Sequence, residues 1–296
     1  MKILLTGGNG FVGCNIVNEI RQTTDWEITC LVNKNYSNIP DDIRKIRGWE
    51  ELGAAVDLGF DFIIHAGGNS SSKSCIEFPE SAFRDNIEST FNILEYARKH
   101  KIKNIIFFSS CEVYGHSTDT SSEVDALVSY NMYGASKIAC EHMCSAYFYS
   151  YGIRTVAIRL LNTYGPFCQE ERFPAIIRKK FETEEGGSGG VPPPHFILSS
   201  PNARKRWLFI REMARRVVFL VKNMPAGFEI FNFVGDENLS LVEFVELFAE
   251  NRPFTYEYTK HEIAGYHHEA NADGSKFADY YRRCSHENDY SDSLFY

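Results

Sequence analysis

The first thirteen residues constrain the fold more than any other stretch of the chain. A short apolar run, residues 3–6, leads directly into Gly7, Gly10 and Gly13 in a GxxGxxG arrangement, and an amphipathic segment follows. A glycine turn between a strand and a helix lets the backbone approach a pyrophosphate, whose charge the helix N-terminus stabilises. Gly13 more simply allows close packing of the helix on the sheet. We therefore expect a dinucleotide to contact this turn, at Gly7, Gly10, Phe11 and Val12.

Apolar runs alternate with helical patterns through the first half of the chain. Strands are predicted at residues 3–6, 28–32, 62–64, 105–108 and 155–160, and helices at 11–20, 86–100 and from Tyr133 onward. Continuous apolar strands alternating with helices indicate an α/β fold, with a parallel sheet covered on both faces. Later, we expect a loop over 183–194 and helices over 212–223 and 239–250, the latter capped by Ser240 or Asn238. The tail from Gly265 is given no structure.

Composition narrows the class of protein. A length of 296 residues suits one large unit or two coupled lobes, and 44% hydrophobic residues can form a substantial core. The net charge of −8 argues against a nucleic-acid partner. The eight cysteines form no CxxC pair and no metal-ligand spacing with histidine, so we expect reduced thiols and no metal. No run approaches the ~18 apolar residues of a membrane span, and we expect a cytoplasmic protein.

The end of the second predicted strand bears on the choice of cofactor. An acidic residue about 20 positions beyond the last glycine would hydrogen-bond the ribose 2′-hydroxyl of NAD. This chain has Leu-Val-Asn-Lys there and no carboxylate, which places Asn33 and Lys34 beside the ribose. Because Lys34 can pair with a 2′-phosphate, the cofactor is expected to be NAD or NADP, with Lys34 favouring NADP.

The segment YNMYGASKI places Tyr133 and Lys137 one helical turn apart, so that they share a face. A lysine ammonium near a phenol favours the phenolate and lowers a pKa that starts near about 10. Tyr133 is then a candidate general base toward a sugar or alcohol hydroxyl. Lys137 is in addition a candidate partner for the nicotinamide ribose.

The motifs TGGNGFVG, SSCEVYG, YxxxK and RLLNTYGP occur in an order that resembles the extended short-chain dehydrogenase/reductase family, in particular its nucleotide-sugar epimerases and dehydratases. The resemblance extends over residues 1–174. It implies a Rossmann-type, doubly wound parallel sheet with a smaller C-terminal substrate lobe, which we place at 1–165 and 166–296 with the second interleaved into the first. It further implies a nucleotide-diphosphate sugar as substrate, and a homodimer formed through helices 86–100 and 133–151.

The resemblance also assigns roles around SSCEVYG. Ser110 matches the Ser/Thr that orients the substrate hydroxyl beside Tyr133. Hexose 4,6-dehydratases carry Thr-Asp-Glu before Val-Tyr-Gly, with Asp as acid and Glu as base, whereas 4-epimerases have small residues at the last two positions. Here Glu112 keeps the candidate base, and Cys111 replaces the acid. A thiol is mostly protonated at neutral pH, so Cys111 is either a proton donor or an inert small residue.

Further matches concern the cofactor and the substrate. The family's His-Leu-Ala-Ala is HAGG in this chain, which places the backbone of Ala66 and Gly67 along the cofactor and gives His65 a structural role. Asn162 matches the Asn-x-Tyr-Gly-Pro residue that contacts the sugar nucleotide. Alignment of RKRWL places Lys205 at a diphosphate-binding arginine. A shift of one residue would substitute either neighbour, Arg204 or Arg206.

Three functions are compatible with this sequence. The first is a dehydratase or epimerase that oxidises carbon 4 of the sugar transiently, with Tyr133 and Lys137 in the oxidation and Glu112 as base. The second is an NADP-dependent reductase of a 4-keto sugar, which Lys34 favours. The third, of another class, is an NAD(P)-sensing module without chemistry, which would have no need of Ser110, Tyr133 and Lys137.

Overall fold

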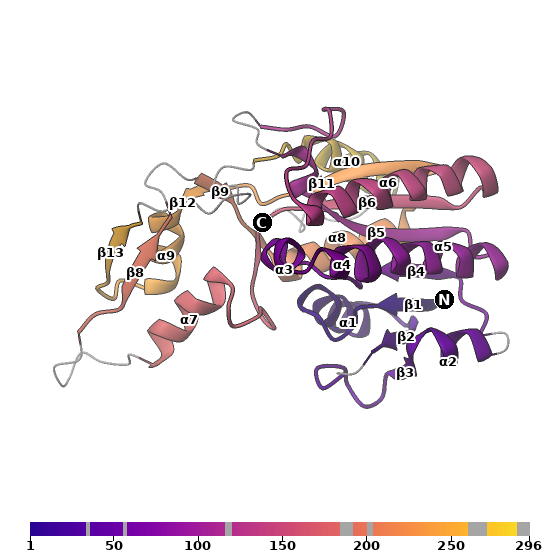
Figure 1. The fold of residues 1–296 in the computed structure, drawn as a ribbon, viewed down its shortest axis with the longest axis horizontal. Helices are drawn as coiled ribbons and strands as arrows, with labels where there is room; N and C mark the ends of the chain where they lie inside the picture. Colours follow the sequence, from indigo (N-terminus) through magenta and orange to yellow (C-terminus); the bar gives the residue numbers. More distant parts are fainter. Residues whose placement is uncertain are drawn as a thin grey trace.

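The structure is a computed structural model, and it describes residues 1–33, 36–55, 58–115, 120–183, 192–199, 204–259 and 271–288. Within these ranges the chain forms a large α/β part and a smaller lobe at one end of it (Figure 1). Part of the predicted 183–194 loop lies outside the described residues, as does Lys34.

The larger part is organised around a seven-stranded sheet with the order β11-β6-β5-β4-β1-β2-β3. All neighbouring strands are parallel. The strands are β1 (Lys2–Thr6), β2 (Glu27–Val32), β3 (Arg44–Arg47), β4 (Phe62–His65), β5 (Asn104–Ser110), β6 (Arg154–Leu160) and β11 (Phe228–Phe233). The predicted Rossmann-type fold is confirmed.

Helices cover both faces of this sheet, because alternate strand residues point to opposite sides. Ile3 and Leu5 belong to the core under α1 (Phe11–Thr23), α8 (Ile210–Lys222) and α10 (Ser275–Asn288). Leu4 belongs to the core on the other face, under α2 (Gly48–Ala54), α5 (Ser89–Lys99) and α6 (Met132–Tyr151). Short turns α3 (Ser72–Glu77), α4 (Pro79–Ala82), the π-helical η1 (Phe83–Glu88) and the 3₁₀ turn η2 (Cys111–Tyr114) lie between these elements.

The smaller lobe has its own aromatic core. Trp207 stacks on Phe244 with ring centroids 3.8 Å apart, and Phe173 and Tyr164 pack around the pair. Its helices are α7 (Phe173–Thr183) and α9 (Leu241–Ala249), and its strand pairs are β7 (Thr163–Tyr164) with β10 (Leu208–Phe209), β9 (Arg204–Arg206) with β12 (Asn238–Ser240), and β8 (His195–Leu198) with β13 (Thr255–Tyr258). Ser240 caps α9 through a reciprocal capping box with Glu243, so of the two predicted caps it is the one used.

Two expectations about the second half are wrong in detail. The tail after Gly265 contains the helix α10, whose Phe277 and Tyr281 are buried against the main sheet. Residues 228–233, for which no strand was predicted, pair with β6 at the edge of that sheet. The chain therefore returns to the larger part after residue 166, and the division at 165 stays a proposal about folding units.

Candidate functional site

The glycine turn after β1 lies against the segment that follows β4, because β1 and β4 are neighbours in the sheet. Gly7 has φ +72°, and a Cβ atom there would lie 2.6 Å from the carbonyl oxygen of Ala66. A Cβ on Gly13 would lie 2.2 Å from the carbonyl oxygen of Gly7. Only glycine fits both places. The structure thus brings Gly7, Gly10, Ala66 and Gly67 together, as the sequence analysis expected.

His65 connects the two segments through a chain of hydrogen bonds that runs from Thr90 to Gly67. Thr90 donates its hydroxyl to a backbone carbonyl, so it accepts from His65 Nε2–H at 3.1 Å. His65 Nδ1 then accepts from the Thr6 hydroxyl at 2.7 Å, and that hydroxyl accepts from the Gly67 N–H at 2.9 Å. Burial, with Lys137 adding to it, lowers the pKa of His65 to about 3, so the ring is neutral. This position agrees with a structural role.

The start of α1 fits a dinucleotide phosphate. Gly10 is the N-cap and supplies no side-chain cap to the first-turn N–H groups, those of Phe11 and Val12 among them. Such uncapped N–H groups are the donors that phosphate takes at helix N-termini. Asn33 follows β2 and is exposed at the same edge of the sheet. The chain's own residues therefore fit a dinucleotide at this edge of the sheet. Lys34 lies outside the described residues.

Tyr133, Ser110 and Lys137 meet at the carboxyl end of β5. The Tyr133 phenol is hydrogen-bonded to the Ser110 side chain. Lys137 Nζ lies 5.9 Å from the centroid of the Tyr133 ring and donates to the carbonyl of Phe108 at 2.8 Å. All three side chains are buried. The predicted Ser–Tyr–Lys grouping is thus assembled by strand β5 and helix α6.

The expected lowering of the Tyr133 pKa is not found. Burial raises the pKa of this phenol to about 12, and the hydrogen bond with Ser110 and the charge of Arg172 oppose that rise. Burial also lowers the pKa of Lys137. The sequence argument counted the charge of the lysine and omitted the desolvation of both groups, which has the larger effect here.

Glu112 acts on the same group of residues. Its carboxylate accepts a hydrogen bond from Asn131 Nδ2 at 3.1 Å, and its charge raises the pKa of Tyr133. Its charge also raises the pKa of Lys205, which burial lowers. The carboxylate of Glu112 thus acts both on the phenol of Tyr133 in the larger part and on the buried ammonium of Lys205 in the smaller lobe.

Cys111 points away from this group. Its thiol donates to the carbonyl of Arg159 at 3.4 Å, and its side chain is packed among Val113, Leu161 and Val234. Burial raises the pKa of the thiol, so the protonated form is held inside the core. The alternative of Cys111 as a proton donor therefore does not fit the structure, and the small structural residue does.

The three basic residues at 204–206 separate in the structure, because successive residues of a strand point to opposite faces. Lys205 is buried and directed toward Glu112. Arg204 is exposed and pairs with Glu243, and Arg206 donates to the carbonyl of Asp236. Among the three, Lys205 is the residue on which the charge of Glu112 acts. Asn162 is half-buried nearby, and its carbonyl accepts from the Leu208 N–H at 2.9 Å.

Comparison with known proteins now decides the family. The family model described as "NAD dependent epimerase/dehydratase family" matches residues 3–233. The chain belongs to this family. The match includes the glycine turn, the Ser–Tyr–Lys grouping and the Lys205 segment.

Individual members are more distant. Over 188 residues the chain is 30% identical to the dTDP-glucose 4,6-dehydratase of Mycobacterium tuberculosis (strain H37Rv), a match covering 58% of this chain and 56% of that relative. It is 25% identical over 279 residues to the dTDP-glucose 4,6-dehydratase of Streptomyces niveus, covering 88% and 80%. The structure of UDP-glucuronic acid 4-epimerase from Bacillus cereus, in complex with UDP-glucuronic acid and NAD, superposes with a TM-score of 0.82 at 20% identity, covering 94% and 92%. At that identity the superposition shows the fold. The expected preference for NADP receives no support from these comparisons.

Two residues at the site escaped the sequence analysis. Asn131 is the N-cap of α6 and also holds Glu112, and an Asn just before a helical pattern is a signal that would have found it. Arg172 comes from the smaller lobe and donates to the Ser70 hydroxyl at 3.0 Å, beside Tyr133. No spacing in the sequence singles out Arg172, because the contact depends on how the lobes meet.

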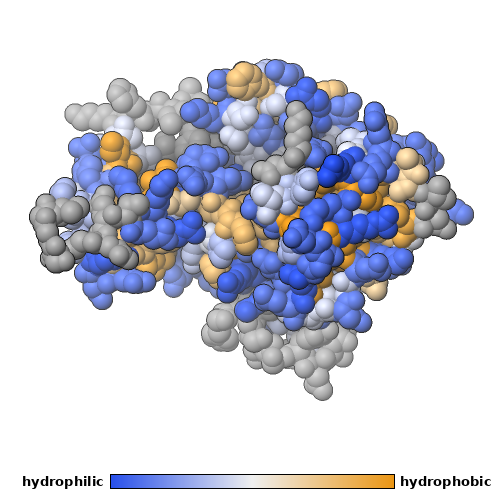
Figure 2. Space-filling view, turned by 90° about the horizontal axis from the view of Figure 1, so that it is seen from below, coloured by the Kyte–Doolittle hydropathy of each residue, from blue (hydrophilic) through white to orange (hydrophobic). Residues whose placement is uncertain are grey.

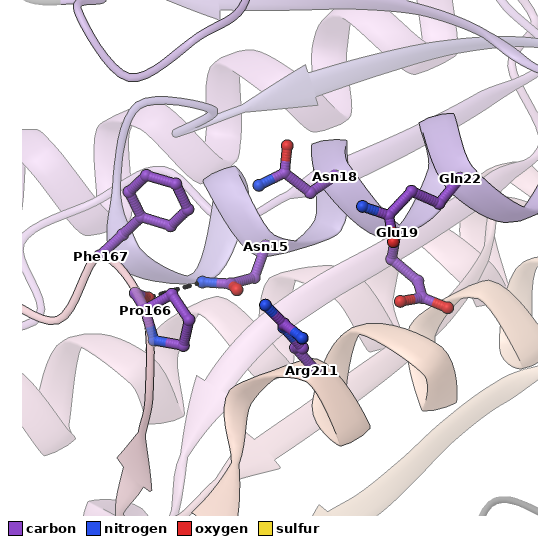
Figure 3. Close-up of a pocket in the computed structure, with 7 residues that line it drawn as sticks. All are labelled: Asn15, Asn18, Glu19, Gln22, Pro166, Phe167 and Arg211. Atoms are coloured by element: carbon purple, nitrogen blue, oxygen red, sulfur yellow. Dashed lines mark hydrogen bonds between the residues drawn. The ribbon is translucent and has the colours of Figure 1, made fainter.

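A separate small pocket lies between α1, the Pro166–Phe167 turn and Arg211 of α8 (Figure 3). Asn15 closes one side of it by donating to the Pro166 carbonyl at 3.0 Å. It contains none of the predicted site residues. Within the described residues, no cluster of three or more His, Cys, Asp or Glu side chains is arranged to hold a metal ion. None of the described helices has the length and apolar character needed to cross a membrane.

Proposed function

We propose that this protein is an NAD-dependent enzyme that acts on a nucleotide-diphosphate sugar through a transient 4-keto sugar, and that it eliminates water. The observation that carries the proposal is the placement of Glu112, which Asn131 holds where its charge acts on Tyr133, with Ser110 and Lys137 beside the phenol. An epimerase needs only the oxidising group. A carboxylate held at this place by Asn131 is what an elimination requires.

Each residue has a definite part in such a reaction. Ser110 and Tyr133 hold the sugar hydroxyl, and Tyr133 accepts its proton. The uncapped N–H groups at the start of α1 would hold a dinucleotide, which would supply reversible hydride acceptance, so that there would be no net redox change. The charge of Arg172 and the hydrogen bond with Ser110 favour the phenolate, against the effect of burial. The ketone acidifies the adjacent carbon–hydrogen bond, and Glu112 removes that proton. The hydroxyl on the next carbon then leaves with the proton that Glu112 has taken up, so that water departs and a carbon–carbon double bond forms.

Lys205 and its neighbours support a nucleotide-diphosphate substrate. Lys205 is a buried cation that points into the junction between the lobes. Three polar atoms of the next two residues and of the paired strand β12 are buried with no hydrogen-bond partner among the described residues: Arg206 Nε, Trp207 Nε1 and Asn238 Oδ1. Buried polar atoms without partners are rare in folded proteins, and a bound polar ligand removes the cost of leaving them unpaired.

The test is Glu112→Gln, which keeps size and hydrogen-bonding capacity but removes the basic oxygen. Elimination is expected to fall by roughly 10²–10⁴-fold, whereas oxidation by Tyr133 and Lys137 should survive. Nicotinamide absorbance should then accumulate in a single turnover. The control is Glu246→Gln, an exposed carboxylate of α9, which should leave both steps unchanged.

Other outcomes separate the alternatives. Full product formation by Glu112→Gln would reject elimination and favour an epimerase. Net consumption of NADPH by the wild-type protein would favour the 4-keto-sugar reductase. Normal dinucleotide binding with no turnover in the wild type, for any nucleotide sugar, would favour the sensing module.

NAD is the proposed cofactor, since the family is NAD-dependent and the preference for NADP depended on Lys34 alone. Titration of the protein with NAD and NADP, followed by tryptophan fluorescence, compares the two affinities. A Lys34→Ala variant with unchanged NAD affinity is the expected result. A large loss of NADP affinity in that variant, together with tighter wild-type binding of NADP than NAD, would reverse the assignment.

Homodimerisation also stays a proposal, with changed contacts. Three apolar residues of α6, one of the two helices expected at the interface, pack partly against the chain's own cores: Ile138, Met143 and Tyr147. Phe83 and Phe91, in contrast, are 58% and 46% exposed on η1 and α5. Polar residues dominate the face shown in Figure 2, with apolar side chains gathered in patches on the larger part. Sedimentation showing only monomer at micromolar concentration would contradict the dimer.

A further inference from the structure

A buried ion pair lies directly behind the turn that carries Ser110 and Glu112. Arg159 is 1% exposed and Glu141 is 3% exposed. Arg159 Nε lies 3.0 Å from Glu141 Oε1, and Arg159 Nη2 lies 2.7 Å from Oε2. This two-point geometry fixes the plane of the guanidinium against the carboxylate. Neither residue takes part in the proton transfers proposed above.

The pair holds the turn on both sides of its functional residues. Ser109, immediately before Ser110, donates its hydroxyl to Glu141 Oε1 at 2.5 Å. Tyr114 accepts from Arg159 Nη1 at 2.7 Å, two residues after the candidate base. The backbone that presents Ser110 is therefore anchored at its start by the carboxylate and at its end by the guanidinium.

A weaker contact lies between these two anchors. The Cys111 thiol donates to the backbone carbonyl of Arg159. The side chains at 109, 111 and 114 thus attach to Glu141 or Arg159, whereas Ser110 and Glu112 act on Tyr133 and Val113 is buried in the core.

Glu141 also connects the turn to the helix of the phenol. It lies on α6, one turn beyond Lys137 and two turns beyond Tyr133. Its charge raises the pKa of Lys137, which shows that the two groups act on each other. The ion pair therefore joins three elements that each carry part of the site: β5 with its turn, α6, and β6.

The energetics favour an orienting role. Desolvation of two charges costs several kcal/mol, and buried ion pairs often add little net stability compared with apolar residues of similar volume. The ion pair instead fixes the positions of Ser109 and Tyr114, because its two-point contact and its hydrogen bonds to them are directional. We propose that Glu141 and Arg159 are positioning residues, which act through Ser109 and Tyr114 to set the placement of Ser110 and Glu112 relative to Tyr133. This inference rests on the proposed function.

The test removes the anchors and leaves the ion pair intact. In the double variant Ser109→Ala/Tyr114→Phe, kcat is expected to fall about 10–100-fold, because a shift of about 1 Å in a catalytic group has an effect of this size. KM for the nucleotide sugar should change less than about threefold, since substrate binding lies mainly with the other lobe. Tyr280→Phe is the matched control. Tyr280 lies in α10, and its hydroxyl donates to the carbonyl of Asn223 at the end of α8, so that it contacts neither the ion pair nor the turn. This variant should leave kcat unchanged.

A second measurement reports geometry without turnover. The hydrogen bond with Ser110 lowers the pKa of Tyr133, so a displaced Ser110 should raise that pKa. The titration of Tyr133, identified by nuclear magnetic resonance against a Tyr133→Phe background, should move to higher pH in the double variant. A variant that is merely less stable would lose activity without this shift.

The outcomes are distinct. Wild-type kcat and an unmoved Tyr133 titration in the double variant would overturn the positioning role and leave the proposed function standing. Absence of turnover in the wild type would reject the proposed function, and the Tyr133 titration would still decide the positioning role. If the double variant does not fold, the single variants Ser109→Ala and Tyr114→Phe carry the test, and unchanged kcat and titration in both would overturn it.

Discussion

Two turns at the carboxyl edge of the same sheet form this site in different ways. The turn after β1 works through its backbone, since Gly7 and Gly13 leave space where any side chain would clash. The turn after β5 works through its side chains, which point alternately to the site and to a buried ion pair. The turn after β1 requires residues without side chains, whereas the turn after β5 requires side chains that bind partners on other elements.

This difference predicts different sensitivities. A backbone site fails when any atom is added, whatever its chemistry. A side-chain site fails only when the particular atom that does the work is removed, and it tolerates change at the residues between.

Gly7→Ala should weaken NAD binding by more than about 100-fold. The added Cβ would lie 2.6 Å from the Ala66 carbonyl oxygen, and the positive φ strains an alanine by about 1 kcal/mol or more. Isothermal titration calorimetry measures the affinity. Gly53→Ala is the control, because a Cβ there meets nothing within 4 Å and α2 tolerates alanine. Wild-type affinity in Gly7→Ala would show that the first turn does not depend on backbone space.

His65→Gln should reduce the sensitivity of folding to acid. In the unfolded chain the histidine pKa is near about 6.5, whereas in the folded protein it is lowered to about 3, mainly by burial. The unfolded state therefore binds more protons, and the unfolding free energy falls by up to about 1.4 kcal/mol per pH unit as the pH drops from about 6.5 toward 3. Urea unfolding at several pH values should show a shallower decline in the variant. Parallel curves would mean that His65 is not neutral beneath the glycine turn.

Cys111→Ala should have the smallest effect on activity. The thiol faces the core, so kcat is expected to stay within about threefold of the wild type, while the unfolding free energy falls by about 1 kcal/mol as a small cavity forms. Steady-state kinetics and chemical unfolding measure the two quantities. A loss of elimination as large as that of Glu112→Gln would restore Cys111 as the acid.

The parts of the fold that could be predicted from sequence are those with a local physical signal. The strand at residues 2–6 and the helix from Phe11 follow from apolar periodicity and the glycine turn. The strand 228–233 and the helix 275–288 were missed, because the aromatic residues that bury them meet partners far away in the chain. Local pattern cannot show that Phe231 and Phe277 pack on each other.

For the site, residue type and spacing identified Ser110, Tyr133, Lys137 and Glu112 as candidates, and the structure brings them together. The electrostatics did not follow from spacing, since burial raises the pKa of Tyr133 where the nearby lysine alone predicted a fall. Desolvation depends on everything packed around a group, and sequence contains no direct measure of it.

The sequence alone determined the dinucleotide-binding turn, the α/β class and the identity of the candidate catalytic residues, because each depends on residue type within a short stretch. Only the tertiary structure decided that Lys205 rather than Arg204 or Arg206 faces the site, that Cys111 faces the core, and that Arg172 reaches Tyr133. Side-chain direction at these positions is set by strand register and by the meeting of two lobes. These are properties of residues distant in the chain, so no local pattern contains them.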